Sequence, residues 1–522
     1  MKPENFKFGK YLTNQSNGWA DPEIIKKHLA EIDIFADNYP GAGTPIISNG
    51  RKAWVDDSER HTLYLGSTGS GKSRWFAMPT IHFLGSRGES FAAIDMKGEL
   101  YAQTSGLLAS KGYDIKVINL RDMKKSCLFN PLTQIHELYH SGKTEQSTAR
   151  LNDLIATLGE DQKRSAKDQY WILSSSMMSL AYFLIFIATS SRKQANLLNF
   201  ANFFAQNSTP EDAERLAKYV ADGSIASINL KNILTNKDAK STFGNIASGV
   251  SNMIAPFIYQ KTLGQVLSQS EIDITKLGDS KTALFLIIPD EKDTYNSLTV
   301  LIIKQIYESL IERAQQQENK KLPVRVNLLL DEAFNLGTIN GLPSMLTASR
   351  SRGIRMFLYA QGLDQIEQRY QKDSNTIIGN CENIIFLNSR ELGLLDWISK
   401  LCGDISVAQL DGSEIARPLI SIQQLQRLSK DKGEALMLIG RHEPLITQLP
   451  DIQNYGFKPY YPIELKEREL PNIIPYDINN VLNEIKSGKR PIPFSEEVHG
   501  EEKFFDEKSA TKPTKGFDIF DW

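Results

Sequence analysis

A glycine-rich octapeptide carries residue types that bind phosphate. It reads Gly66-Ser67-Thr68-Gly69-Ser70-Gly71-Lys72-Ser73 and follows the short apolar run at residues 62–65. A glycine-rich loop between a strand and a helix directs backbone N–H groups and the helix dipole at one point, where phosphate is favoured. In this pattern, the Walker A motif, the lysine reaches the β- and γ-phosphates and the serine hydroxyl holds Mg²⁺. The motif therefore predicts a nucleoside triphosphate site.

A pair of carboxylates, Asp331 and Glu332, follows the apolar run at residues 326–330. A P-loop ATPase needs one carboxylate to hold Mg²⁺ and a second to orient or deprotonate the attacking water. On its own, the pair is equally consistent with a solvated strand end. Because a complete Walker A motif is present in the same chain, we interpret Asp331 as a metal ligand and Glu332 as a catalytic residue.

These two motifs need a scaffold that brings them together, and the apolar periodicity predicts one. Strand-like runs alternate with helical patterns, which favours an α/β fold with a parallel sheet covered by helices on both faces. The expected strands are residues 62–65, 91–95, 114–119, 282–288, 326–330, 354–359, 383–388 and 434–439.

The middle of the chain has a different pattern. Residues 144–261 look helical and carry little strand signal, with a loop and a helix start near residues 208–212. We therefore predict an all-α domain inserted into a nucleotide-binding domain of residues 42–143 and 262–458. The most apolar stretch, residues 177–188, is shorter than the roughly 20 residues that span a bilayer, which favours a buried helix over a membrane-associated one.

Composition is that of an ordinary globular protein. The chain has 522 residues, 41% of them hydrophobic and 23% charged, with a formal net charge of -2. Two domains with tails are expected from this length, and any contact with nucleic acid must depend on local basic patches. Three cysteines without a CxxC pair indicate a reducing compartment, with neither structural zinc nor a disulfide framework.

The C-terminal region changes character. Residues 459–494 are punctuated by prolines and are expected to be a linker. Residues 495–522 are acidic and aromatic, with too little apolar mass for a core of their own. We interpret this tail as a docking segment for a substrate or adaptor protein, with a purely solvated tail as the alternative.

The motifs, taken in order, resemble those of the type IV secretion coupling proteins. The resemblance extends over about residues 42–450 and includes Gln361, eleven residues after Arg350. The matching segments are the Walker A loop and residues 95–101, 130–132, 331–333, 349–353 and 417–420.

This resemblance implies a RecA-like ATPase in which Arg350 is an arginine finger acting in trans and Gln361 is a polar sensor. A guanidinium from a neighbouring subunit stabilises charge on the transferring phosphoryl group, a contribution on the order of 10³–10⁵ in rate elsewhere. The alternatives for Arg350 are a surface salt bridge or a DNA-facing charge, with Arg352 and Arg355 as competitors for the finger role. For Gln361 the alternative is a polar cap on a strand end.

The same resemblance implies a function. We expect a homo-hexameric coupling ATPase that uses ATP and Mg²⁺. It would recruit relaxase-bound DNA to the channel proteins of a conjugative secretion system and drive or gate the transfer of this DNA, which we expect to be single-stranded. Two alternatives remain open: a nucleotide-gated docking platform without DNA pumping, and a chromosome-type DNA translocase, which the helical insertion disfavours.

Many proteins of this kind have an N-terminal transmembrane region. Here residues 1–41 are a polar extension in which we expect no anchor. The expectation is a cytoplasmic chain recruited to the cytoplasmic face of the cell membrane by a separate membrane protein.

Overall fold

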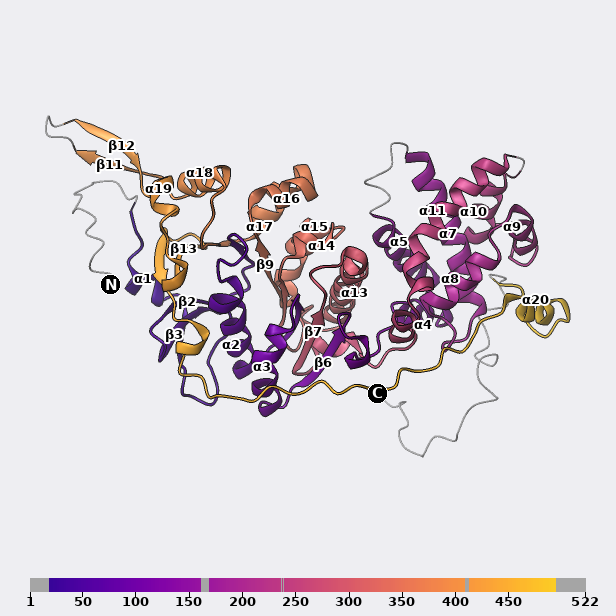
Figure 1. Cartoon of the computed structure of the whole chain (residues 1–522), viewed down its shortest axis with the longest axis horizontal. Coiled ribbons are helices and arrows are strands. Elements are labelled where there is room, and N and C mark those ends of the chain that lie inside the picture. Colours follow the sequence, from indigo (N-terminus) through magenta and orange to yellow (C-terminus); the bar gives the residue numbers. More distant parts are fainter. Residues whose placement is uncertain (1–17, 161–168, 236, 238, 409–412, 494–522) are drawn as a thin grey trace. The chain divides into compact units, whose positions relative to one another are not determined.

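The computed structural model describes residues 18–160, 169–235, 237, 239–408 and 413–493 (Figure 1). The chain divides into two compact units. The sheet unit takes residues 1–127 and 272–468, and the helical unit takes residues 128–271 and 469–522. The predicted combination of an α/β domain with an all-α domain is confirmed.

The boundaries of the units differ from the expected ones. Helices α4 (Thr133–His140) and α12 (Lys261–Val266) belong to the helical unit, although the expected all-α segment was residues 144–261. Ser147 Oγ in α5 (Thr144–Leu158) donates to the Ile135 carbonyl of α4 at 2.8 Å. Such side-chain contacts to a distant backbone have no signature in the sequence pattern.

The sheet unit is built around nine strands in the order β14-β13-β10-β4-β9-β8-β5-β7-β6. The strands are β4 (Thr62–Leu65), β5 (Ser90–Asp95), β6 (Asp114–Asn119), β7 (Thr282–Ile287), β8 (Val326–Leu330), β9 (Ile354–Ala360), β10 (Asn383–Phe386), β13 (Glu434–Ile439) and β14 (Leu445–Gln448). All eight expected strands are present.

The expected all-parallel sheet is wrong at one edge. In the order of the sheet, β6, β7, β5, β8, β9, β4 and β10 all pair in parallel. Strand β13 is antiparallel to β10, and β14 is antiparallel to β13. Antiparallel strands at the edge of a parallel sheet are common in α/β folds, and strand direction is not visible in apolar periodicity.

Helices cover both faces of this sheet. One face packs on α2 (Met78–Arg87) and α3 (Glu99–Ser110), and together they form a hydrophobic core. On the other face, α14 (Ala333–Leu336) and α15 (Leu342–Ser349) pack on β9, and α13 (Asn296–Gln315) packs on α14 (Figure 1). The remaining elements of the unit are α16 (Leu363–Tyr370), α17 (Ser374–Asn380), α18 (Leu392–Leu401), β11 (Asp404–Ala408), β12 (Glu414–Pro418) and α19 (Ile422–Leu425).

A second, three-stranded sheet packs against this core. Its order is β1-β3-β2, with β1 (Ala30–Asp33), β2 (Thr44–Ser48) and β3 (Lys52–Asp56), and it follows α1 (Pro22–Lys26). Part of the expected N-terminal extension, residues 1–41, therefore forms α1 and β1, and both contribute buried side chains, Ile25 and Ile32, to the core.

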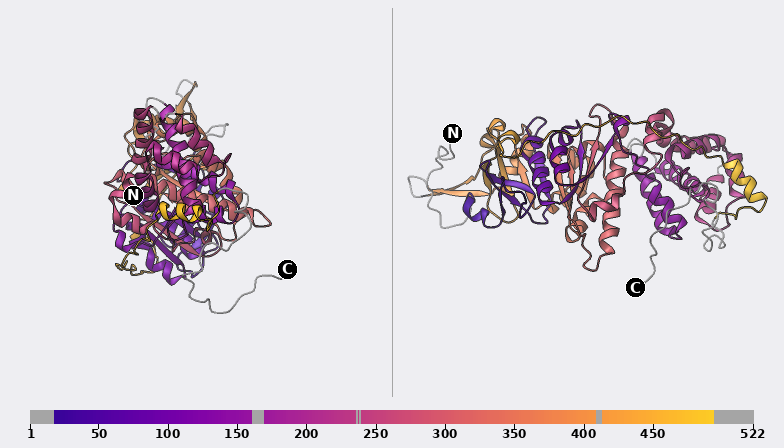
Figure 2. Two further views of the ribbon diagram at one scale, coloured as in Figure 1. Left: turned by 90° about the vertical axis from the view of Figure 1, so that its right-hand side faces the viewer. Right: turned by 90° about the horizontal axis from the view of Figure 1, so that it is seen from below.

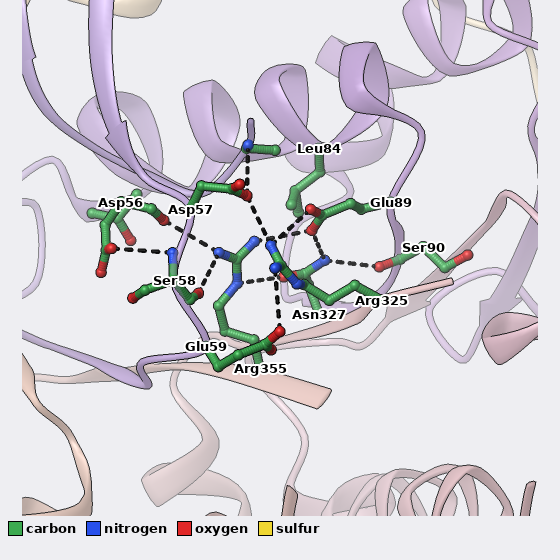
Figure 3. A network of polar contacts seen from close by, with 12 residues as sticks. Asp56, Asp57, Ser58, Glu59, Leu84, Glu89, Ser90, Arg325, Asn327 and Arg355 are labelled. Atoms are coloured by element: carbon green, nitrogen blue, oxygen red, sulfur yellow. Dashed lines mark hydrogen bonds and ion pairs between the residues drawn. The ribbon is translucent and has the colours of Figure 1, made fainter. Parts of the chain in front are cut away.

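A buried polar network ties the two sheets together at the edge where the parallel strands begin (Figure 3). The Arg355 side chain is 1% exposed and lies at its centre. It donates to Asn327 Oδ1 at 2.8 Å, to Glu89 Oε2 at 3.0 Å and to the carbonyls of Asp56 and Ser58. The guanidinium thus bonds the starts of β8 and β5 to the end of β3.

The helical unit consists of α-helices among the described residues. Besides α4, α5 and α12 they are α7 (Gln169–Thr189), α8 (Leu197–Gln206), α9 (Pro210–Ala217), α10 (Ile225–Leu234), α11 (Lys240–Tyr259) and α20 (Ile478–Lys486). Its centre is α7, which packs on α10 and α11 and stacks Phe183 on Phe200 of α8.

Helix α7 is longer than the sequence pattern indicates. It has 21 residues, so by length and composition it could cross a membrane, and it is the single described helix that passes this test. The expectation that the apolar stretch is too short is therefore wrong for the helix as a whole. However, 67% of its most apolar window is buried within the fold, as for a core helix.

The expected linker, residues 459–494, is divided between the two units. In the sheet unit, Ile463 N–H donates to Ser105 Oγ at 3.0 Å. In the helical unit, α20 lies beside α9, where Arg215 donates to Asn479 at 2.9 Å (Figure 2, yellow helix). The acidic tail, residues 495–522, lies outside the described residues, and its docking role stays a prediction.

Candidate nucleotide site

The glycine-rich loop leaves β4 between two neighbouring strands, β9 and β10. Gly66 N–H donates to the Ala360 carbonyl at the end of β9 at 3.1 Å, and Ser67 N–H donates to the Asn388 carbonyl beyond β10 at 2.9 Å. These bonds fix the start of the loop at the edge of the sheet where the parallel strands end.

Two glycines of the loop have backbone conformations that favour glycine. The φ angles are +74° at Gly69 and +93° at Gly71. A Cβ at Gly71 would lie 2.3 Å from Trp75 Cδ1, so Gly71 needs its lack of a side chain for both reasons. After the loop, Ser73–Ala77 form a wide π-helical turn that leads into α2, a feature often found at functional sites.

The Lys72 ammonium group lies inside the loop. Its Nζ donates to the Gly66 carbonyl at 2.6 Å and to the Ser67 carbonyl at 3.3 Å. Burial lowers the pKa of Lys72, and the charges of Asp331 and Glu332 oppose this shift. The cation is thus held between the loop and the acidic pair.

Asp331 follows β8 and meets the Walker A serine. Ser73 Oγ donates to Asp331 Oδ2 at 3.5 Å. Burial, followed by the nearby charge of Glu332, raises the pKa of Asp331 to about 6, although Lys72 acts in the opposite direction. A carboxylate that is costly to ionise in the protein alone is well placed to gain from a bound cation.

Glu332 has an unusual backbone. Its φ is +50° and ψ is +24°, the left-handed region that non-glycine residues seldom adopt. Such strain persists where surrounding contacts enforce it and is frequent at functional sites. The Glu332 carboxylate accepts a hydrogen bond from Asn335 Nδ2 at 3.0 Å.

Gln361 directly follows β9, the strand that separates β4 from β8. It therefore lies at the same sheet edge as Asp331, between the strand of the glycine-rich loop and the strand of the acidic pair. Its backbone N–H donates to Gln365 Oε1 at 2.8 Å.

Arg350 is not brought to this edge within the same chain. It precedes β9, whose seven residues span roughly 20 Å, so it lies at the opposite edge of the sheet. Its half-exposed side chain pairs with Glu382. Of the competing arginines, Arg355 is buried in the polar network of Figure 3, whereas Arg352 donates to the Ala348 carbonyl at 2.6 Å.

Three further polar residues lie around the acidic pair: Asn335 and Gln365, which sequence reasoning missed, and Asp95, which lies in a segment that matches the family but was given no role. Asp95 ends β5 beside β8, accepts from Tyr101 N–H at 2.8 Å, and contributes to the raised pKa of Asp331. Asn335 is three residues after Glu332, and Gln365 is four after Gln361. These are helical spacings, which could have indicated them.

The donors at this edge fit a triphosphate with its metal ion. Ser70 is one of the loop residues that would surround a phosphate. Its Oγ is buried and has no hydrogen-bond partner within the described part of the chain. The Ser73 hydroxyl and Asp331 carboxylate are oxygen ligands of the kind that Mg²⁺ prefers.

The chain is similar to proteins of conjugative DNA transfer. A family model described as type IV secretory system conjugative DNA transfer matches residues 20–440. The conjugal transfer protein TraG of Escherichia coli is 21% identical over 445 residues, which cover 78% of this chain and 67% of TraG.

Solved structures of the plasmid coupling protein TrwB have the same fold. Complexes of TrwB with a non-hydrolysable GTP analogue and with an ATP analogue each have a TM-score of 0.58 at 14% identity, over 88% of this chain and 98% of TrwB. A complex of TrwB with ADP and Mg²⁺ has a TM-score of 0.57 at 14% identity, over 88% of this chain and 97% of TrwB.

Proposed function

Because the chain belongs to the type IV secretory system conjugative DNA transfer family, we propose that it is a coupling ATPase. It recruits relaxase-bound, single-stranded DNA to the transport channel and uses ATP hydrolysis to drive or gate the transfer. ATP with Mg²⁺ is the proposed fuel, as supported by the ATP-analogue and ADP–Mg²⁺ complexes of TrwB.

One observation carries this proposal: three strands deliver a phosphate-binding loop, an acidic pair and a polar side chain to a single sheet edge. Lys72 and Ser73 follow β4, Asp331 and Glu332 follow β8, and Gln361 follows β9, the strand between them. These are the groups that positioning and electrostatic catalysis of phosphoryl transfer require.

Each side chain has a proposed task. Lys72 and the N–H groups of residues 66–73 bind the β- and γ-phosphates. Ser73 and Asp331 would hold Mg²⁺, which would neutralise charge on the phosphate oxygens. Glu332 orients the attacking water and accepts its proton. Gln361 senses the γ-phosphate from the end of β9.

Arg350 completes the site of a neighbouring subunit. The roughly 20 Å length of β9 keeps this cation from the nucleotide of its own chain, whereas its half-exposed position leaves it available to another copy. This geometry supports a site that a second copy completes, and we propose a homo-hexamer in which hydrolysis depends on assembly.

The proposed partners are the relaxase and its accessory proteins, the channel proteins of the secretion system and a separate membrane protein that tethers the chain. The proposed location is the cytoplasmic face of the cell membrane. The TraG relative, named for conjugal transfer, supports this setting.

The test is an ATPase assay over a range of protein concentrations, with and without single- and double-stranded DNA. We expect steep concentration dependence, stimulation by DNA, and loss of activity in Lys72→Ala and Arg350→Ala variants. Lys466→Ala, an exposed lysine outside the segments that match the family, is the control and should keep full activity.

Two other results would favour other functions. Relaxase binding that is indifferent to Lys72→Ala, together with ATPase activity that DNA does not stimulate, would favour a nucleotide-gated docking platform. DNA-stimulated hydrolysis without any capture of a relaxase would favour a chromosome-type translocase.

A further inference from the structure

A continuous set of hydrogen bonds connects Glu332 with the end of β9. Asn335 Nδ2 donates to Glu332 Oε2 at 3.0 Å, and Gln365 Nε2 donates to Asn335 Oδ1 at 2.8 Å. Gln365 Oε1 then accepts from the backbone N–H of Gln361 at 2.8 Å. The two amide side chains thus bridge two strand ends that both face the proposed nucleotide.

The direction of this relay is forced by chemistry. A backbone N–H can only donate, so Gln365 must present its oxygen to Gln361 and its NH₂ group to Asn335. Asn335 must then accept with its oxygen and direct its own NH₂ group at the carboxylate. The assignment of both amides therefore follows from the network itself.

The helix that carries Gln365 is held against the segment after β8. Arg369 Nε of α16 donates to the Phe334 carbonyl at 3.1 Å, and its Nη2 donates to the Asn335 carbonyl at 3.3 Å. Ile339 N–H donates to Tyr370 OH at 2.9 Å. Because α16 and this segment are bonded at several points, a shift at the end of β9 is transmitted to Asn335.

Glu332 needs such support, because its left-handed backbone is a conformation that the chain does not favour by itself. Among the described residues, Asn335 is the one side chain that donates to the Glu332 carboxylate. A carboxylate that must activate a water within hydrogen-bond reach is sensitive to small displacements.

We propose that Asn335 and Gln365 are positioning residues that fix the direction of the Glu332 carboxylate and couple it to the strand end at Gln361. This inference rests on the proposed role of Glu332 as the base in ATP hydrolysis. The two amides hold the base in its productive orientation and take no part in binding the nucleotide.

The experiment measures steady-state ATPase kinetics of the full chain with DNA present. Asn335→Ala and Gln365→Ala are each expected to lower kcat at least about tenfold while the KM for ATP stays within about twofold, because only orientation of the base is lost. The double variant should lose no more than the more affected single variant, since both act through one relay.

A conservative variant separates positioning from folding. Gln365→Glu keeps the size of the side chain and the acceptor for Gln361 N–H but cannot donate to Asn335. The Asn335 amide then turns its oxygen toward Glu332, so kcat should fall as in Gln365→Ala with an unchanged melting temperature. Gln368→Ala, an exposed glutamine on the same helix, is the matched control and should behave as the unaltered protein.

Failure of this inference and failure of the proposed function give different results. If Glu332→Gln is inactive while Asn335→Ala, Gln365→Ala and Gln365→Glu keep full kcat, the relay does not position the base and the inference is wrong. If Glu332→Gln itself keeps full activity, the catalytic role of Glu332 is wrong and the relay has no task. Additive losses in the double variant would also contradict a single relay.

Discussion

Ser73 Oγ donates to Asp331 Oδ2 at 3.5 Å, although the two residues are 258 positions apart in the chain. Residues 128–271 of the helical unit lie between them in sequence, yet β4 and β8 are separated by a single strand in the sheet. If the two residues hold Mg²⁺ as proposed, the metal requirement would depend on the protonation of Asp331.

Proton competition should weaken metal binding at mildly acidic pH. The pKa of Asp331 is raised to about 6, so the carboxylate takes up a proton as the pH falls through that value. Between pH about 7.5 and about 5.5, the Mg²⁺ concentration that gives half-maximal nucleotide binding should therefore rise several-fold. Titration of a fluorescent nucleotide with Mg²⁺ measures it, and the same midpoint at both pH values would contradict the expectation.

Removing the Asp331 charge should stabilise the nucleotide-free protein. A carboxyl group whose pKa is higher in the folded than in the unfolded state destabilises the fold when it is ionised. For Asp331 this destabilisation is complete above pH about 6 and absent below pH about 4. Asp331→Asn is expected to add on the order of 2–3 kcal/mol at pH 8, by the size of this pKa shift.

Thermal melts without nucleotide at pH 8 and pH 4 check this expectation. The gain in melting temperature should be present at pH 8 and absent at pH 4. Asp364→Asn, an exposed carboxyl on α16, is the control and should change neither. A loss of stability at pH 8 in Asp331→Asn would show that the carboxylate is favourably paired in the folded state.

The buried arginine of the polar network should matter more for stability than the exposed one. Arg355 is 1% exposed and is one of two cations that pair with Glu89, the other being Arg325. Arg355→Leu removes this charge and leaves the buried acceptors of the network without their donor, so it is expected to cost about 3–5 kcal/mol. Arg350→Ala removes a half-exposed ion pair with Glu382 and is expected to cost no more than about 1 kcal/mol. Urea unfolding of both variants compares them, and equal losses would contradict the role of the network in Figure 3.

The sequence predicted the elements of the site better than their connections. The loop of residues 66–73 and Asp331 were predicted because each follows an apolar run, and parallel strands end at a common edge. Gln361 was predicted from the resemblance to the family. The start of α9 was likewise visible, since Thr209 and Asp212 form a capping box there. Local patterns of this kind report on the residues that carry them.

What the sequence could not show depends on contacts between distant segments. The left-handed backbone of Glu332, its bond to Asn335 and the relay through Gln365 exist because α16 packs on the segment after β8. The burial of Arg355 depends on Glu89, 266 positions away. The antiparallel direction of β13 is equally a consequence of pairing, because strand periodicity is the same in both directions.

A mixture of two inactive variants should regain ATPase activity if each site is shared between subunits. Arg350→Ala lacks the proposed finger but keeps Glu332, and Glu332→Gln lacks the base but keeps Arg350. Glu332 follows β8 and Arg350 precedes its parallel neighbour β9, so the two residues lie at opposite edges of one sheet. A mixed ring then contains interfaces where an intact Glu332 meets an intact Arg350 from the next copy. Assays of each variant alone and of their mixture, at equal total protein, measure the recovery.

A mixture of Lys72→Ala with Glu332→Gln is the control: both variants have lost the same half of the site, so no interface is complete and activity should stay absent. No recovery in the first mixture, from variants that form rings by light scattering, would place finger and base in one subunit and rule out a site completed in trans.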